Sequence, residues 1–168
     1  MSIGEVIHEF RKEKGMTQQE FAEQLPIDRT ALAKYESGKR RPNDEVLQKA
    51  ASTFDDPRLY LAVQDEATGG ASSPWLNGVD LHRASVLWKS IEEIKEVIAV
   101  SGSAPISKTR DQITEADRLQ IKILIMESVE AITALTHLVA VLCKEYAFSW
   151  LGVWKEHRAE LKAKKYTK

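Results

Sequence analysis

Cysteine is almost absent from this sequence. Cys143 is the single one among 168 residues, so no disulfide can form within the chain. Stability must therefore come from packing, which suits a reducing compartment, and we expect Cys143 to be a buried core thiol. The chain begins Met-Ser-Ile-Gly-Glu, which does not resemble a signal peptide. Together these features predict a cytoplasmic protein.

The patterns that mark catalytic and metal centres are also missing. The sequence contains no glycine-rich phosphate loop and no Ser–His or Cys–His arrangement near a strand. His82, His137 and His157 are scattered and lack the spacing of metal ligands. We therefore expect no enzymatic activity, no metal site and no cofactor.

Charge of one sign is not in excess. The formal net charge is −1, from 24 basic and 25 acidic residues. No global basic excess therefore points to nucleic acid as a partner. Such a role has to be argued from a local cluster of charge and from a motif.

Strand-like alternation is absent over any length, and glycine and proline divide the chain instead. Residues 1–63 form a dense block with apolar residues at helical spacing. Residues 64–78 include a small, polar stretch with two adjacent glycines, which is typical of a linker. From Trp75 onward large aliphatic residues and all four tryptophans appear. We predict an all-α protein with an N-terminal domain at 1–63, a linker at 64–78 and a helical domain at 79–168.

Five helices are predicted in the first domain. Gly15 ends the first helix, at a position that favours a left-handed residue. Thr17 and Glu20 have the spacing of a capping box, which opens the second helix. Asp28 caps the third helix, and Gly38 ends it. The first, third and fifth helices are predicted at 3–14, 29–37 and 57–63, and residues 42–43 open the fourth.

The second and third helices are short and joined by a tight turn, and their exposed residues suit DNA. Ala22 is placed where the two axes cross, and Ile27 fills the turn. Basic side chains bond guanine or phosphate, threonine and alanine meet thymine methyl groups, and a helix N-terminus binds phosphate. The residues expected at DNA are Thr17, Gln18, Gln19, Arg29, Thr30, Ala31, Lys34, Lys39, Arg40 and Arg41. A solvated surface is the alternative reading of the basic run at 39–41.

This combination resembles the helix-turn-helix family of lambda-type phage repressors and Cro proteins, often called the Xre family. The matching segments are residues 3–7, 11–22 and 35–42. The resemblance implies that Gln18 holds the DNA backbone, that Arg29, Thr30 and Lys34 read bases, and that an ion pair joins Arg11 and Glu36. The family usually has glycine in the turn where this chain has Pro26. The strand-rich self-cleaving domain of many phage repressors is not visible in the second half.

Three further helices are predicted in residues 79–168, as a bundle or hairpin. Asp80 caps the first, and Thr114 with Asp117 opens a long helix that reaches about residue 146, followed by a last helix at about 149–164. Apolar residues recur along the long helix at spacings of four and three, which indicates a heptad seam. This seam predicts an isologous dimer contact at Ile121, Ile125, Ile132, Leu135, Val139 and Leu142. A self-contained monomeric bundle is the alternative.

The most apolar stretch, residues 121–143, also has the length of a membrane span. It contains Lys122, Glu127, Glu130 and His137, which would be costly in a membrane interior. A buried bundle helix accounts for the same residues, so we predict no membrane contact.

These features together predict a dimeric transcriptional regulator, a prophage-type repressor, that binds a palindromic operator in double-stranded DNA. An antirepressor or a regulatory protein or peptide would then dock on the helical domain. The alternative is an antitoxin-like protein whose helical domain binds a partner protein and whose DNA-binding domain autoregulates. An enzyme with a DNA-binding domain is a third hypothesis, which would require a deep polar pocket in the helical half.

Overall fold

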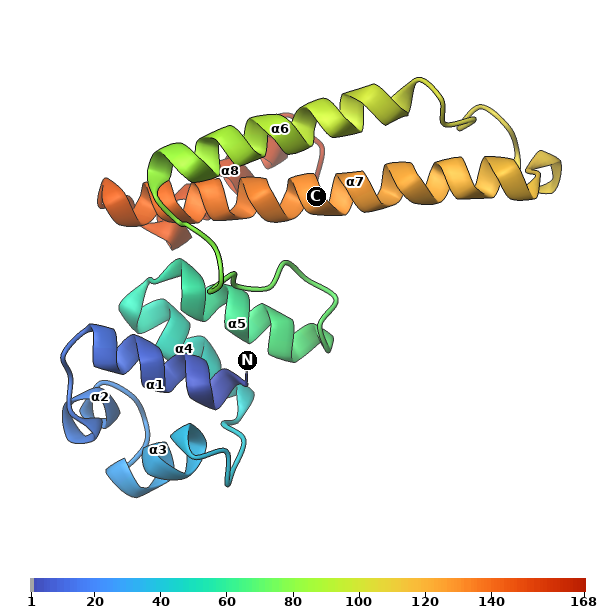
Figure 1. Ribbon diagram of the computed structural model, residues 1–168. Coiled ribbons are helices and arrows are strands. Elements are labelled where there is room, and N and C mark those ends of the chain that lie inside the picture. The colour runs from blue at the N-terminus through green and yellow to red at the C-terminus, as the bar shows by residue number, and fades with distance from the viewer. Residues whose placement is uncertain (1) are drawn as a thin grey trace. The chain divides into compact units, whose positions relative to one another are not determined.

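The computed structural model describes residues 2–168, and all of its regular secondary structure is helical within that range (Figure 1). The all-α prediction is therefore confirmed. The helices are α1 (Ile3–Glu13), α2 (Gln18–Glu23), α3 (Arg29–Glu36), α4 (Asp44–Phe54), α5 (Pro57–Thr68), α6 (Arg83–Ser101), α7 (Glu115–Glu145) and α8 (Trp150–Ala163), with a 3₁₀ turn at Arg110–Gln112.

The described chain divides into two compact units. One holds the chain up to Trp75 together with Tyr146–Lys168, and the other is Leu76–Glu145. Helix α8 thus groups with the N-terminal helices, whereas we predicted from sequence that it belongs with α6 and α7. In addition, α5 extends to Thr68, five residues into the segment that we predicted as a linker.

Helix ends follow the capping residues that the sequence contains. Thr17 accepts from Glu20 N at 3.2 Å, and Glu20 accepts from Thr17 N at 2.7 Å, which confirms the predicted capping box. Thr114 and Asp117 form the same reciprocal pair at the start of α7. Gly15 follows α1 with φ +68°, as expected of a residue that must adopt the left-handed region.

The core of the N-terminal unit is apolar and centred on three phenylalanines. Phe21 of α2 stacks on Phe54 of α4 with ring centroids 4.7 Å apart, and Phe10 of α1 meets Phe54 edge-on at 5.2 Å. Phe10 and Phe21 are both 0% exposed. Because these rings come from three helices, they fix α2 against α1 and α4, and α2 supports the adjoining turn and α3.

Arg58, at the start of α5, closes the other end of this core. Its guanidinium lies 5.7 Å from the Phe10 ring centroid and 5.8 Å from that of Trp75, and it forms an ion pair with Glu13. A guanidinium between aromatic faces is stabilised by cation–π attraction. Trp75 is therefore held on the N-terminal unit, so the end of the predicted linker is anchored there.

Asp55 caps the start of α8 from a distant point in the sequence. It ends α4 in the left-handed conformation, with φ 46°. Its carboxylate accepts hydrogen bonds from Ser149 Oγ at 2.5 Å and from Leu151 N at 2.9 Å. An anionic cap is favourable at a helix N-terminus, where backbone N–H groups are unpaired. This contact explains why α8 belongs to the N-terminal unit.

The second unit is an antiparallel hairpin of α6 and α7, which lie side by side in Figure 1. Buried His137 ties the preceding segment to α7. Its Nε2 accepts from Leu76 N at 3.0 Å, and its Nδ1 lies 2.8 Å from Thr133 O. These two contacts join the segment before α6 to α7. Cys143 is buried at 5% exposure, as predicted.

One predicted cap is wrong. Asp80 was expected to cap α6, but the N-cap is His82, whose Nδ1 accepts from Ala84 N at 3.3 Å. The Asp80 carboxylate instead accepts from His82 N and Ser85 Oγ. Asp80 lies two residues before the N-cap, because the helix begins at Arg83, and its carboxylate positions the capping residue His82.

Candidate nucleic-acid interface

Helices α2 and α3 form the predicted pair of short helices joined by a tight turn. Ala22 is 1% exposed and Leu25 is 8% exposed, so the inner side of the pair is closed. No residue from 24 to 28, all of them described, has positive φ. Pro26 therefore fits a turn in which glycine is usual, because this turn does not need a left-handed residue.

Glu36 is the hydrogen-bonding centre behind this pair of helices. Its side chain is 4% exposed and accepts from Arg11 Nε at 2.6 Å and Arg11 Nη2 at 2.8 Å. It also accepts from Gln18 Nε2 at 2.9 Å and lies 3.1 Å from His8 Nδ1. The Arg11–Glu36 ion pair implied by the family resemblance is therefore present, and its fork geometry links α1, α2 and α3.

The same contacts set the protonation of Glu36. Burial alone would raise the pKa of this carboxyl. Hydrogen bonds from Arg11, Gln18 and His8, with the charge of Arg11, outweigh burial and lower the pKa from 4.5 to about 2. Since the folded-state pKa lies below the unfolded one, Glu36 contributes stability above about pH 4.5, and this is lost as pH falls toward 2.

We expect Glu36→Gln to lower the free energy of unfolding by about 2 kcal/mol at pH 7, because the variant lacks this charge. The difference from the wild type should shrink below pH 4.5 and vanish near pH 2. Urea unfolding across this pH range measures it, with Glu9→Gln on the exposed side of α1 as the control. A stability difference independent of pH would contradict the electrostatic role of Glu36.

The predicted DNA contacts lie on the outer side of α2 and α3. Asp28 caps α3 by accepting from Ala31 N at 2.7 Å, which fixes the first turn of that helix. In α3, Arg29, Thr30 and Lys34 are exposed and Ala31 is half-buried. At the start of α2, Thr17 and Gln19 are exposed, whereas Gln18 is half-buried through its bond to Glu36. One surface thus carries both the residues predicted to read bases and those predicted to bind phosphate.

A shallow depression of about 700 Å³ joins α1 to this surface. Its lining consists of residues from three helices: His8, Arg11, Lys12, Thr17, Gln18, Gln19 and Arg29. Basic side chains together with the N-terminus of α2 suit a phosphate group. His8 and Lys12 were not among the residues predicted from sequence to contact DNA. Their signal is the four-residue spacing, which places both on the side of α1 that holds Arg11.

The basic run after α3 is only partly available for binding. Lys39, Arg40 and Arg41 are all exposed. However, Arg41 Nε lies 2.7 Å from Glu66 Oε1 of α5. Lys39 and Arg40 are therefore the stronger candidates for contact with the DNA backbone.

Comparison with known proteins agrees with this geometry. A helix-turn-helix family model matches residues 7–58, which span α2, the turn and α3. Residues 7–58 form a helix-turn-helix domain. The chain is also similar to the HTH-type transcriptional activator BcrR of Enterococcus faecalis, with 43% identity over 54 residues, or 32% of this chain and 26% of that protein. No solved structure matches the chain significantly.

The helix-turn-helix domain is a DNA-binding domain of the kind found in transcriptional regulators. The chain spans about a quarter of the length of the curated relative that it matches. The similarity therefore covers the DNA-binding unit and leaves the α6–α7 hairpin outside it.

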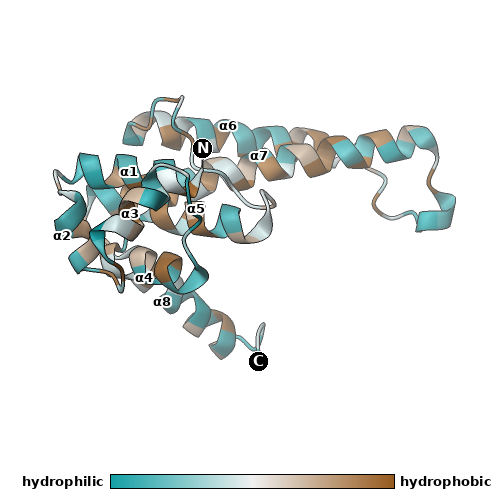
Figure 2. Cartoon of the chain, turned by 90° about the horizontal axis from the view of Figure 1, so that it is seen from below, coloured by the Kyte–Doolittle hydropathy of each residue, from teal (hydrophilic) through white to brown (hydrophobic). Residues whose placement is uncertain are grey.

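The predicted dimer seam lies on α7 and is largely uncovered within the chain. Four of its residues are exposed: Ile125 (55%), Ile132 (57%), Leu135 (38%) and Leu142 (37%). The other two, Ile121 and Val139, are half-buried. By length and composition α7 is also able to cross a membrane, since its most apolar stretch has a mean hydropathy of 1.6 and is 17% buried. Figure 2 shows apolar segments alternating with polar ones along both hairpin helices.

Proposed function

We propose that this protein is a transcriptional repressor that binds a palindromic operator as a homodimer through its helix-turn-helix domain. The observation that carries the proposal is the outward face of α3, with Arg29, Thr30 and Lys34 exposed, beside the N-terminus of α2. One such helix reads only a few base pairs, so two helices one DNA turn apart are needed for a specific site. Repression requires only that this site overlap a promoter.

The hairpin provides a surface for the second copy. On α6, the buried residues Val86, Ser90 and Glu93 mark the side that faces α7. Exposed Leu87, Ile94 and Ile98, with half-buried Ile91, form a stripe rotated by about one residue from that side. This stripe would be left in water if the chain were a monomer.

The stripe on α7 has the same offset. Ala131 is buried toward α6, and Ile132 follows it by one residue, as Ile125 follows Leu124. Equal offsets in an antiparallel pair place both stripes on one side of the hairpin. A second hairpin packed on this side would make a four-helix bundle and cover both stripes. In a membrane, by contrast, Lys122, Glu127 and Glu130 of α7 would each have to be buried in lipid.

We expect Arg29→Ala and Lys34→Ala each to weaken specific DNA binding by about 1–3 kcal/mol without loss of stability, because both side chains are exposed. Fluorescence anisotropy with the selected operator and a scrambled duplex measures the effect. Lys49→Ala, at an exposed position of α4, is the matched control. Unchanged operator affinity in both variants would refute the assignment of α3 as the reading helix.

We expect the double variant Lys39→Ala/Arg40→Ala to weaken binding to all sequences alike, because these residues would contact phosphates. The slope of log affinity against log salt should fall by about 0.9 for each phosphate that the variant no longer neutralises. Arg41→Ala should change the slope less, since Arg41 pairs with Glu66. Equal slopes in the wild type and the double variant would show that the run is a solvated surface.

The experiment that tests the whole proposal is selection of genomic DNA. The purified protein is incubated with sheared DNA from its own genome, and retained fragments are sequenced, with Arg29→Ala as the control. We expect a palindromic site near the protein's own gene, lost in the variant, and repression of a reporter that carries this site. No enrichment over Arg29→Ala would overturn the proposal, and activation of the reporter would overturn the repressor assignment.

A further inference from the structure

Four glutamates converge on one side of the α6–α7 hairpin. Glu93 and Glu96 lie on α6, and Glu127 and Glu130 lie on α7, each pair at a spacing of three residues. One carboxylate oxygen from each lies within 4.8 Å of the corresponding oxygen of the other three. The spacing places each pair on one face of its helix, and the antiparallel pairing of the helices brings the two pairs together.

Glu93 is the buried member of this cluster. The residue is 3% exposed, and its Oε2 is buried without a hydrogen-bond partner. Its Oε1 is 2.6 Å from Lys89 Nζ, which also binds Glu92 at 2.7 Å. A buried carboxylate oxygen without a hydrogen-bond partner is costly, so a ligand that bound Glu93 Oε2 would stabilise the hairpin.

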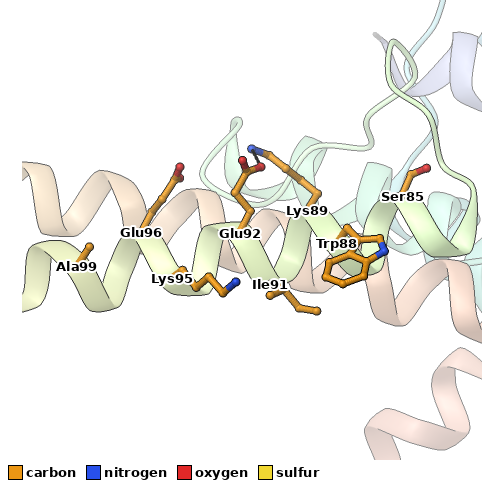
Figure 3. A pocket seen from close by; sticks show the side chains of 8 residues that line it. All are labelled: Ser85, Trp88, Lys89, Ile91, Glu92, Lys95, Glu96 and Ala99. Carbon is orange, nitrogen blue, oxygen red and sulfur yellow. Dashed lines mark hydrogen bonds and ion pairs between the residues drawn. The ribbon is translucent and has the colours of Figure 1, made fainter.

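The charge of the cluster is not balanced by the chain. Within residues 2–168, the side chains of Glu96, Glu127 and Glu130 make no ion pair, and Lys89 is shared between Glu93 and Glu92. Figure 3 shows Lys89, Glu92 and Glu96 projecting from one side of α6, away from Ile91 of the apolar stripe. The carboxylates therefore repel one another until a cation joins them.

We propose that Glu93, Glu96, Glu127 and Glu130 bind a hard divalent cation that ties α6 to α7. Carboxylate oxygens are the ligands that Ca²⁺, Mg²⁺ and Mn²⁺ prefer. Ligands on opposite sides of Ca²⁺ lie about 5 Å apart and those on Mg²⁺ about 4 Å apart, so the 4.8 Å spread suits the larger ion without rearrangement. The site lies away from the apolar stripes, so a dimer leaves it accessible.

The test is thermal unfolding and titration calorimetry of the full chain, first in EDTA and then with CaCl₂, MgCl₂ or MnCl₂ at constant ionic strength. We expect saturable binding and a rise in Tm of roughly 5 °C or more at saturation, largest with CaCl₂. Glu127→Gln should weaken ion binding at least tenfold and should have a higher Tm than the wild type in EDTA, because repulsion is relieved. The wild type should thus have the lower Tm in EDTA and the higher Tm with saturating ion. This reversal is expected only if Glu127 binds the ion.

Glu115→Gln, an exposed carboxylate at the start of α7, is the matched control and should behave as the wild type in both conditions. Glu93→Gln should also abolish binding, and Glu127→Gln keeps the test decisive if Glu93→Gln does not fold. Absence of saturable binding of all three ions to the wild type would overturn the proposal, as would equal ion affinity in Glu127→Gln. The assay contains no DNA, so its outcome is independent of the proposed repressor function.

Discussion

Gly4→Ala should destabilise the N-terminal unit by about 3 kcal/mol or more, although it adds a single methyl group. A Cβ at residue 4 would lie 2.1 Å from the backbone oxygen of Tyr35. Tyr35 belongs to the last turn of α3, so α1 and α3 would have to separate. Backbone atoms of a packed helix cannot move aside as a flexible side chain can, and the cost therefore falls on the whole unit.

The measurement is urea unfolding of the full chain, together with operator affinity at a temperature where the variant is still folded. We expect weaker DNA binding in the folded variant, since α3 also carries Arg29 and Lys34. Gly102→Ala is the matched control, because Gly102 has φ −68° and a Cβ there would meet no atom within 4 Å. Equal stability of the two variants would mean that α1 and α3 do not approach at Gly4 in solution.

The elements of the fold that could be predicted from sequence are those determined by residues close to one another in the chain. The capping box at Thr17 and Glu20 and the left-handed Gly15 each depend on residues within one turn of helix. The helix-turn-helix was recognised for the same reason, because its helices and turn are contiguous in sequence. Gly4 lies within the segment that resembles the family, but its close approach to Tyr35 became visible only in three dimensions.

Elements that depend on residues far apart in the sequence were not predicted. The grouping of α8 with the N-terminal unit depends on Asp55, which binds Ser149, the N-cap residue of α8, 94 residues later in the sequence. No pattern near Ser149 contains that information. The extension of α5 to Thr68 was missed because the polar residues after Val63 are equally typical of a linker and of the end of an exposed helix.

The candidate functional residues divide in the same way. Arg29, Thr30 and Lys34 could be predicted because they follow the turn directly in the sequence. His8 and Lys12 were missed because α1 meets α2 and α3 only after folding. The glutamate pairs of α6 and α7 were missed for a similar reason. Each pair alone is typical of a solvated helix face, and only the antiparallel register of the hairpin brings the four carboxylates together.

Leu135→Glu and Ile94→Glu should each convert the proposed dimer to a monomer and weaken operator binding by about 100-fold or more. Both side chains lie on the apolar side of the hairpin, Leu135 on α7 and Ile94 on α6, and are 38% and 39% exposed in the single chain. A charge buried between two hairpins would face apolar side chains without a partner. The loss of affinity follows because each DNA-binding domain would then bind its half-site alone.

Sedimentation equilibrium of the full chain and operator titration measure the two effects on the same samples. Leu119→Glu is the matched control: Leu119 is 56% exposed on the same helix, but helical spacing places it away from the seam. A Leu135→Glu variant that still sediments as a dimer would exclude the α7 seam. A wild-type protein that pellets with membranes and requires detergent for release would instead assign the apolar surface of α7 to lipid. Since Ile94 lies on α6, concordant effects of Ile94→Glu and Leu135→Glu are expected only if both stripes face one partner, which is what a four-helix bundle requires.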